Sequence, residues 1–311
     1  MYPLTCGPKM LPDYLLRVLL TPKFTAYATK ASTRAQIPKL NRKALFSFQF
    51  PLPPLAEQRR IVDILNRANG IRRLRREALA KTRQLIPALF VDTFGDPVSN
   101  PRGWPIVRLG GLLDFTTSGS RGWGKYYSDA GASFIRVQNL TRNELSLRDV
   151  AHVDPPAGAE AERTKISAGD VLLAITGAPG LAAVAPDLVD DAYVNQHVAI
   201  LRPKSDILGS TYLWGFIAST SGGQLQLGLS AYGQTRAGLG FAQIRALQCP
   251  LPPLGLQHEF ASRVAGIQAT IAQQERMAEA SEQLVAALMA QLFDGGAASK
   301  AAAAAVAAAP V

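Results

Sequence analysis

Two long segments of the chain carry hydrophobic residues at helical spacing. In the first, the apolar positions recur every three or four residues, with Arg75 and Thr82 as polar members of the same frame: Ile61, Ile64, Ala68, Ile71, Ala78, Leu85 and Leu89. The second has the same spacing: Phe260, Val264, Ile267, Ile271, Met277, Leu284 and Leu288. Broken heptads of this kind are typical of a short coiled coil, so we expect two long helices that pair.

Proline pairs mark where these helices start. Pro53-Pro54 and Pro252-Pro253 restrict the backbone and stop a helix from extending back through them. The helices should therefore begin near Ala56 and Gly255. Pro87 removes a backbone donor inside the first segment, which predicts a kink or an end there.

The chain also contains a long internal repeat. Residues 50–58 read FPLPPLAEQ and residues 249–257 read CPLPPLGLQ, an offset of 199. The same offset places Phe94 on Phe293, and Tyr14-Leu15 resembles Tyr212-Leu213 once one gap is allowed. Solenoid repeats run to roughly 20–50 residues, so this period instead indicates two copies of a module made of a globular part and a long helix.

Charge supports pairing of the two helices. Residues 57–91 hold nine Arg or Lys against three Asp or Glu, whereas residues 256–292 hold two Arg against four Glu. Opposite net charges favour the helices as mutual partners. Two amphipathic helices packed on separate domains are the alternative.

The region from Trp104 to Leu247 has a mixed pattern. Short apolar runs at 134–137, 171–175 and 194–201 alternate with Gly-rich turns and predict strands, while 212–219 predicts a helix. The expected fold class is α+β, a mixed α/β domain plus two long antiparallel helices forming a coiled coil. The expected divisions are an N-terminal segment 1–49, the first long helix within 50–95, the mixed domain 96–248, the second long helix within 249–295 and a disordered Ala-rich tail at 296–311.

Composition narrows the class of partner. The 311 residues carry a net charge of +10, which favours a polyanion such as nucleic acid. Cys6 and Cys249 form no disulfide framework, which favours the cytoplasm. The sequence contains no uninterrupted stretch of about 18 apolar residues, so we expect no membrane association.

Several phrases in a fixed order resemble a known family. They are Gly103-Trp104-Pro105, Phe134–Val137, the Gly169–Leu173 run with Thr176-Gly177, Val194–Gln196, and the repeated Pro-Leu-Pro-Pro-Leu with a following Gln. Together they resemble the specificity subunits of type I restriction–modification systems. The resemblance implies that two target-recognition domains alternate with two long helices, and that each domain reads one half of a bipartite site in double-stranded DNA. It further implies that the helices set the spacing and dock methyltransferase subunits, and through them restriction subunits.

The first copy of the module departs from this pattern. Residues 1–49 resemble only the end of a recognition domain, whereas 96–248 resembles a complete one. One alternative is a truncated, inactive remnant. The other is a homodimer whose two large domains read a palindromic bipartite site.

Candidate DNA-contacting residues come from four places along the chain. Reading bases requires bidentate donors such as Arg, Asn and Gln, and holding phosphates requires Lys, Arg and small hydroxyls. The Gly-rich segment 116–127 is the first choice, with Ser118, Ser120, Arg121, Lys125 and Tyr126. The further candidates are Arg136, Gln138, Asn139 and Arg142, then Thr176, Gln234, Thr235 and Arg236. Asn195, Gln196 and His197 fit hydrogen-bonded side chains inside the domain better than base contacts.

No residue pattern predicts catalysis. Asp154-Pro155-Pro156 is followed by Ala157, which cannot stack on a flipped base, and Asp187, Asp190 and Asp191 have no nearby lysine. The expectation is a non-enzymatic specificity subunit that needs no cofactor or metal of its own. The alternatives are a helical protein–protein scaffold and a solo DNA-modifying enzyme.

Overall fold

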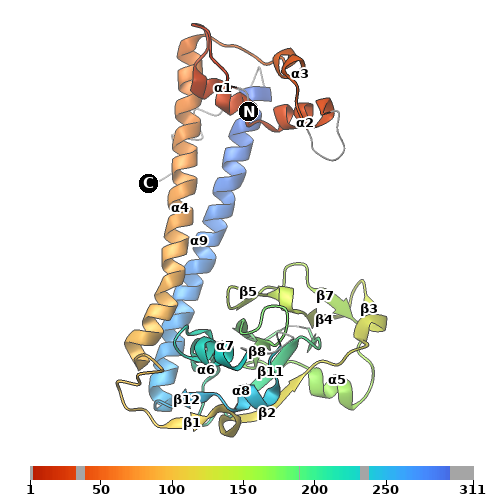
Figure 1. Ribbon diagram of the computed structural model, residues 1–311, viewed down its shortest axis with the longest axis vertical. Helices are drawn as coiled ribbons and strands as arrows, with labels where there is room; N and C mark the ends of the chain where they lie inside the picture. The colour runs from red at the N-terminus through yellow and green to blue at the C-terminus, as the bar shows by residue number, and fades with distance from the viewer. Residues whose placement is uncertain (1–2, 33–38, 189, 232–237, 295–311) are drawn as a thin grey trace. The chain divides into compact units, whose positions relative to one another are not determined.

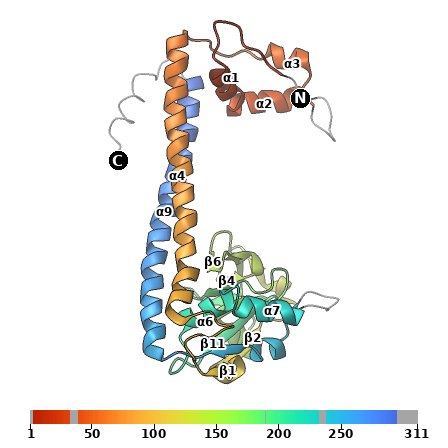
Figure 2. The same ribbon diagram turned by 60° about the vertical axis from the view of Figure 1, so that its left-hand side comes forward.

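The computed structural model describes residues 3–32, 39–188, 190–231 and 238–294. The chain forms two compact units (Figures 1 and 2). The first unit holds Met1–Thr82 with Thr270–Val311, and the second holds Arg83–Ala269. Two long helices, α4 (Leu55–Phe94) and α9 (Leu254–Asp294), each contribute residues to both units.

The starts of both long helices confirm the expectation from the proline pairs. Helix α4 begins at Leu55 and α9 at Leu254, directly after Pro54 and Pro253. Pro87 does not end α4, which continues to Phe94. Phe90 and Phe94 lie beyond the proline and are buried against Tyr212 and against Phe260. This aromatic cluster holds the last turns in place despite the missing backbone donor.

The first unit is helical. Short helices α1 (Pro12–Leu19), α2 (Pro22–Ala31) and α3 (Arg42–Ser47) accompany the adjoining parts of α4 and α9. Its core is a single cluster of buried side chains: Tyr14, Val18, Ile61, Val62, Leu65, Ala68, Val285, Leu288 and Phe293. Burying these side chains is what fixes α1 on the two long helices.

Within this unit α4 and α9 pair in antiparallel fashion. Arg72 and Arg76 form ion pairs with Glu282 at 3.3 and 2.6 Å, and Arg75 donates a 2.8 Å hydrogen bond to the carbonyl oxygen of Met277. Rising numbers on α4 therefore meet falling numbers on α9. The prediction that the basic and the acidic helix pair with each other is confirmed.

The predicted register of the two stripes is partly wrong. Ile71 is 46% exposed, Met277 43% and Leu284 46%, whereas Leu65 and Val285, which the stripes omitted, are buried. The polar side chain of Ser281 lies at the contact, where it also meets Arg75. Because polar residues fill the middle of this interface, apolar residues at heptad spacing there face outward.

The second unit is a mixed α/β domain. Its first four-stranded sheet has the order β10-β4-β7-β3, formed by Ala192–Val194, Ala132–Ile135, Ala151–Val153 and Tyr127–Ser128. Its second has the order β2-β11-β8-β9, formed by Leu113–Ser118, Val198–Pro203, Val171–Ala174 and Ala182–Val184. Strands β10 and β4 are parallel, and the other neighbours in both sheets are antiparallel.

Short elements complete this unit. Two-stranded pairs join β1 (Ile106–Arg108) to β12 (Gln248–Pro250) and β5 (Leu140–Thr141) to β6 (Glu144–Leu145). The helices are α5 (Ala159–Thr164), α6 (Ser210–Ala218), α7 (Gly223–Ala231) and α8 (Phe241–Arg245). Single 3-10 turns are η1 (Leu109–Leu112), η2 (Trp123–Tyr126) and η3 (Val137–Asn139). The expected α+β class and coiled-coil helices are confirmed.

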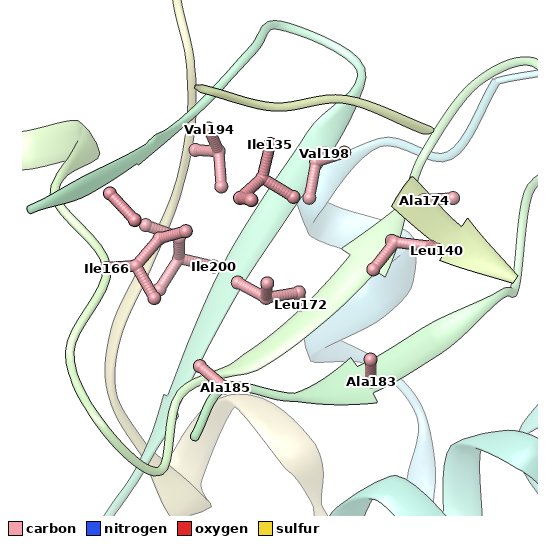
Figure 3. Packing of buried hydrophobic residues seen from close by; sticks show 11 residues of the cluster. Ile135, Leu140, Ile166, Leu172, Ala174, Ala183, Ala185, Val194, Val198 and Ile200 are labelled. Atoms are coloured by element: carbon pink, nitrogen blue, oxygen red, sulfur yellow. The ribbon is translucent and has the colours of Figure 1, made fainter. Parts of the chain in front are cut away.

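The core of the second unit is shared by its two sheets (Figure 3). Ile135 and Val194 from the first sheet meet Leu172, Val198 and Ile200 from the second, and all five are completely buried. These residues come from the apolar runs that predict strands. The run at 194–201 is broken, because β10 ends at Val194 and β11 begins at Val198.

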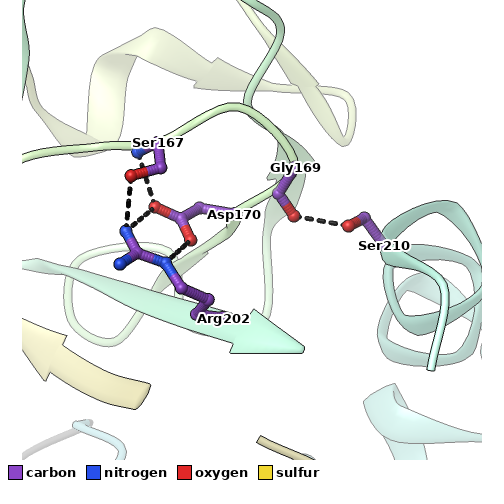
Figure 4. Close-up of polar contacts among 5 residues, drawn as sticks. All are labelled: Ser167, Gly169, Asp170, Arg202 and Ser210. Atoms are coloured by element: carbon purple, nitrogen blue, oxygen red, sulfur yellow. Dashed lines mark hydrogen bonds and ion pairs between the residues drawn. The ribbon is translucent and has the colours of Figure 1, made fainter. Parts of the chain in front are cut away.

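A buried ion pair ties β8 to β11 (Figure 4). Arg202 donates to both carboxylate oxygens of Asp170 at 2.7 and 2.8 Å, and to Ser167 Oγ at 2.8 Å. These hydrogen bonds raise the pKa of the Arg202 guanidinium. Asp170 is 1% exposed, so removing Arg202 would leave the buried carboxylate without its counter-charge. The Gly-Asp-Val phrase of the sequence thus serves the fold.

The internal repeat is also present in three dimensions. Gln58 Oε1 accepts from the Leu11 backbone N–H at 2.8 Å, and its amide donates to the carbonyl oxygens of Lys9 and Pro53. Gln257 makes the same set with Gly209, Ile207 and Pro252. Both long helices therefore start with a glutamine that binds the helix to the chain before it in the same way, as expected for a repeat.

Candidate nucleic-acid interface

One end of the second sheet gathers three polar segments. Ser118 at the end of β2 is paired with Ala199, and Val198 at the start of β11 is paired with Ala174 at the end of β8. The residues that follow β2, precede β11 and follow β8 therefore leave the sheet at the same end. We call this region the polar sheet end and define it by 118–120, 195–197 and 176–177.

The loop after β2 is fastened to helix α5. Arg163 Nη1 donates to Thr117 Oγ1 and to the Ser118 carbonyl oxygen, and Nη2 donates to Ser120 Oγ, all at 2.7 Å. Glu160, one turn earlier on α5, accepts a 2.7 Å hydrogen bond from Trp123 Nε1. The hydrogen bonds from Trp123 and Ser120 lower the pKa of the Glu160 carboxyl. Both ends of this loop are thus held by one short helix.

The predicted residues of this loop differ in exposure. Arg121 and Lys125 are exposed, Tyr126 is half-buried, and Lys125 Nζ lies 4.9 Å from the centroid of the Tyr126 ring. Trp123 is 3% exposed and stacks on Phe134. The indole belongs to a small aromatic core, so stacking on a base is left to other side chains.

Of the predicted residues in the segment after β4, Asn139 is buried, whereas Gln138 and Arg136 reach the surface. Asn139 is 1% exposed; its Oδ1 accepts from the Arg136 backbone N–H at 3.0 Å and its Nδ2 donates to the Ser146 carbonyl oxygen at 3.1 Å. These bonds close a turn and leave Asn139 no surface for DNA. Gln138 is exposed, and Arg136 is half-buried with its guanidinium 3.5 Å from the Asp149 carbonyl oxygen.

Arg142 lies on the β5–β6 turn. Arg142 and Asn143 have φ angles of 54° and 60°, in the left-handed region where Asn is tolerated and Arg is uncommon. The Asn143 side chain accepts a 3.1 Å hydrogen bond from the Ala182 backbone N–H at the start of β9. The turn is therefore docked on the second sheet, and the Arg142 side chain is exposed.

Thr176 belongs to a hydrogen-bonded group with His197. The Thr176 hydroxyl bonds to His197 Nδ1, Gln196 Nε2 lies 3.0 Å from His197 Nε2, and Asn195 Oδ1 accepts from the His197 backbone N–H. Asn195, Gln196 and His197 are half-buried, in keeping with their expected hydrogen-bonding role. Gln234, Thr235 and Arg236 lie outside the described residues.

Sequence reasoning missed Arg163. The surrounding Ala159–Thr164 reads as a short surface helix, and nothing in its composition points to the β2 loop 43 to 46 residues earlier. Its role became visible only through its hydrogen bonds.

The chemistry of the polar sheet end is that of binding. It offers hydroxyls and amides at the end of a rigid sheet, and the exposed cations Arg121 and Lys125 follow Ser120 in the adjoining loop. Such groups suit phosphate and base edges. Across the described part of the chain, the side chains of His, Cys, Asp and Glu form no cluster of three or more that could hold a metal ion. Among the same residues, no helix has the length and apolar character needed to cross a membrane.

The fold defines the class: a mixed α/β domain joined to a coiled coil of two long antiparallel helices. The family model described as the type I restriction modification DNA specificity domain matches residues 8–78 and 101–280. Since that match covers most of the chain, the protein belongs to this family.

Individual relatives agree. The chain is 34% identical over 98 residues to the type I restriction enzyme EcoDI specificity subunit of Escherichia coli, a match that covers 30% of this chain and 22% of that protein. It thus spans about a fifth of that curated relative.

Solved structures have the same fold. A chain from a type I restriction–modification complex has a TM-score of 0.61 at 23% identity, covering 90% of this chain and 70% of that one. The type I S subunit from M. genitalium has a TM-score of 0.56 at 12% identity, covering 92% and 74%.

Proposed function

We propose that this protein is the non-catalytic DNA-recognition subunit of a type I restriction–modification complex, and that its second unit reads one half of the DNA site at the polar sheet end. The family match and the relative named as a specificity subunit support this function. Methylation and cleavage would belong to partner subunits. Such a complex would act on DNA in the cytoplasm.

The observation that carries the proposal is the convergence of distant segments at one sheet end. Ser118 ends β2 and Ser120 follows it, Thr176 follows β8, and Asn195–His197 precede β11, so distant stretches of sequence meet at one end of the second sheet. The exposed Arg121 and Lys125 belong to the same loop as Ser120. Arg136, Gln138 and Arg142 extend the proposed surface. A net charge of +10 adds the attraction that phosphate binding requires.

We further propose that the long helices dock methyltransferase subunits and, through them, restriction subunits. In the first unit, α4 exposes Ile71 (46%) and Leu74 (56%), and α9 exposes Met277 (43%) and Leu284 (46%). Spacings of three and seven residues place each pair on one face of its helix. Exposed apolar stripes of this kind fit a helical protein partner.

Each segment of the repeated module has its own proposed role. Residues 96–248 form the complete recognition domain, while 50–95 and 249–295 supply the helices. Residues 1–49 would be the C-terminal remnant of a first recognition domain, which is supported by Tyr14 and Gln58 repeating the contacts of Tyr212 and Gln257. Two associated copies would offer two identical recognition domains.

Sequence selection tests DNA recognition. The purified chain, alone and with a candidate methyltransferase, is incubated with randomised duplex DNA, and the bound fraction is sequenced. We expect enrichment of one short half-site, with an affinity that falls steeply as salt rises. Bound DNA without any enriched sequence, or no saturable binding in either form, would contradict the proposal.

Partner docking has a separate test. The double variant Leu74→Gln with Met277→Gln should lose co-purification with the methyltransferase, while DNA selection by the second unit persists. Ala290→Gln adds the same polar group at an exposed position of α9 off the stripe and is the matched control. Equal co-purification of all three proteins would rule out this docking surface.

A further inference from the structure

The tip of the β2 loop is fixed on both sides by one helix. Arg163 bonds to Ser120 on one side of the tip, and Glu160 bonds to Trp123 on the other. Only Arg121 and Gly122 lie between these two fixed points. Gly122 has a φ of 100°, a left-handed conformation that a side chain would strain, so the tip turns sharply at this residue.

The base of the same loop has little room to move. Its Gly119 N–H donates to the Asn195 carbonyl oxygen at 3.1 Å, and a Cβ on Gly119 would lie 2.1 Å from the Val194 carbonyl oxygen. The loop therefore lies directly against the chain that precedes β11. Because Gly119 at the base and Ser120 and Trp123 at the tip are all held, the backbone that carries Arg121 is fixed in position before any ligand binds.

Resting on the DNA-recognition function proposed above, we infer that Arg163 is a positioning residue: it holds the Thr117–Trp123 loop so that Arg121 meets DNA in one geometry, and it thereby helps to set which sequence is read. A planar guanidinium can reach Thr117 Oγ1, the Ser118 carbonyl and Ser120 Oγ together, as it does here. An ammonium group keeps the charge but lacks this fixed fork of donors.

Pre-ordering has a direct consequence for recognition. A loop that is already ordered loses less conformational entropy on binding, and base edges are distinguished only when donors are held in narrow geometry. Releasing the loop should therefore weaken discrimination between sequences more than it weakens attachment to phosphates.

A plain phosphate contact by Arg163 is the rival explanation, and the two differ in what lysine can restore. If Arg163 only neutralised a phosphate, Arg163→Lys would bind normally. Arg163→Met would then lose affinity uniformly across sequences and lower the salt slope by about one. A positioning role predicts that lysine fails to restore sequence preference although the charge is present.

The experiment measures sequence selection and salt-dependent affinity for the full chain with four variants. Arg163→Lys and Arg163→Met change the side chain that binds the β2 loop, and Ser120→Ala removes one of the hydrogen-bond partners of Arg163. Arg263→Met removes an exposed charge on α9 and is the matched control. We expect the affinity ratio between preferred and random duplexes to fall about tenfold in both Arg163 variants, the scale of one base contact. The ratio should fall less in Ser120→Ala, because the bonds of Arg163 to Thr117 and Ser118 remain.

The outcomes distinguish failure of DNA recognition from failure of the positioning role of Arg163. If the wild-type chain selects no sequence, the DNA-recognition function fails. If it selects a sequence and Arg163→Lys selects the same one with an unchanged ratio, the positioning role is overturned. Thermal unfolding identifies a variant that fails to fold, in which case Ser120→Ala and Arg163→Lys carry the decision.

Discussion

The two units make the same hydrogen bonds at the start of their long helices but differ in how deeply the neighbouring apolar side chains are buried. Tyr14 donates to the Pro51 carbonyl oxygen as Tyr212 donates to that of Pro250, and each unit has its bonded glutamine. In the second unit Leu213, Ile217 and Ile244 are completely buried, because α6 lies on the second sheet and α8 lies by η1.

Their counterparts in the first unit remain partly exposed. Leu15, Leu19 and Leu45 are half-buried and, with Phe46, Phe48 and other residues, line an apolar cavity of about 170 Å³. Phe46 itself is 73% exposed. The comparison teaches that the local contacts of the repeat fix the helix starts on their own, whereas these apolar positions are fully buried only where the second sheet packs on α6 and η1 packs on α8.

The largest expected effect comes from truncating matched leucines. Leu213→Ala should destabilise the second unit by about 3 kcal/mol, because a fully buried leucine leaves a cavity. Leu15→Ala should cost the first unit about 1 kcal/mol or less, since that side chain already meets solvent. Hydrogen exchange in α6 and in α1 measures each unit by itself. Equal losses would mean that the two surfaces are buried alike.

The glutamines should behave alike in both units. Gln58→Ala and Gln257→Ala each leave partly buried backbone groups without their side-chain partner, which costs about 1 kcal/mol. Denaturant unfolding followed by hydrogen exchange at the start of α4 and of α9 checks the pair. The comparison would break if one substitution proved neutral, because its glutamine would then not fasten the helix.

Alkaline pH should distinguish the second unit. Burial raises the pKa of the Cys249 thiol to about 12, and the first unit has Phe50 at the repeat-matched position. An unfolded cysteine has a pKa of about 8.5, so the folded state binds the thiol proton more tightly than the unfolded state does. The contribution of this proton to the free energy of unfolding is therefore fully present below about pH 8.5.

As pH rises above that value, the second unit should lose about 1.4 kcal/mol per pH unit from this thiol. The difference between wild type and Cys249→Ala in unfolding free energy at pH 8 and pH 10 measures it. Parallel pH profiles for the two proteins would exclude the thiol as the cause.

The smallest effect should come from the helix ion pairs of the first unit. Glu282 is 40% exposed and faces Arg72 and Arg76, so Glu282→Gln should cost less than about 1 kcal/mol, and high salt should reduce that cost further. Thermal melts at low and high salt suffice. A loss of several kcal/mol that salt does not reduce would show that these helices depend on the pair far more than a surface contact allows.

Some features were predictable because they depend on local sequence. The proline pairs predicted both helix starts, and the 199-residue repeat predicted two related long helices, whose glutamines Gln58 and Gln257 make matching hydrogen bonds. Continuous apolar runs such as 171–175 predicted buried strands. Each of these signals acts within a few residues of chain.

Other features failed because they depend on contacts between distant residues. Ile71 fits the heptad frame yet is exposed, since polar side chains occupy that stretch of the interface. Asn139 suits a base contact by residue type, but its hydrogen bonds to Arg136 and Ser146 bury it in a turn. Periodicity and residue type do not say which face or which partner a side chain finds.

The sequence by itself determined the modular plan, the class of fold and the ends of the long helices, because backbone restriction and hydrophobic periodicity act locally. Only the tertiary structure decided which stripe residues are buried, and that Arg163 of α5 holds the β2 loop. The physical reason is that side-chain hydrogen bonds reach only about 3 Å, so their partners are chosen by strand register and packing, which bring residues far apart in the chain together.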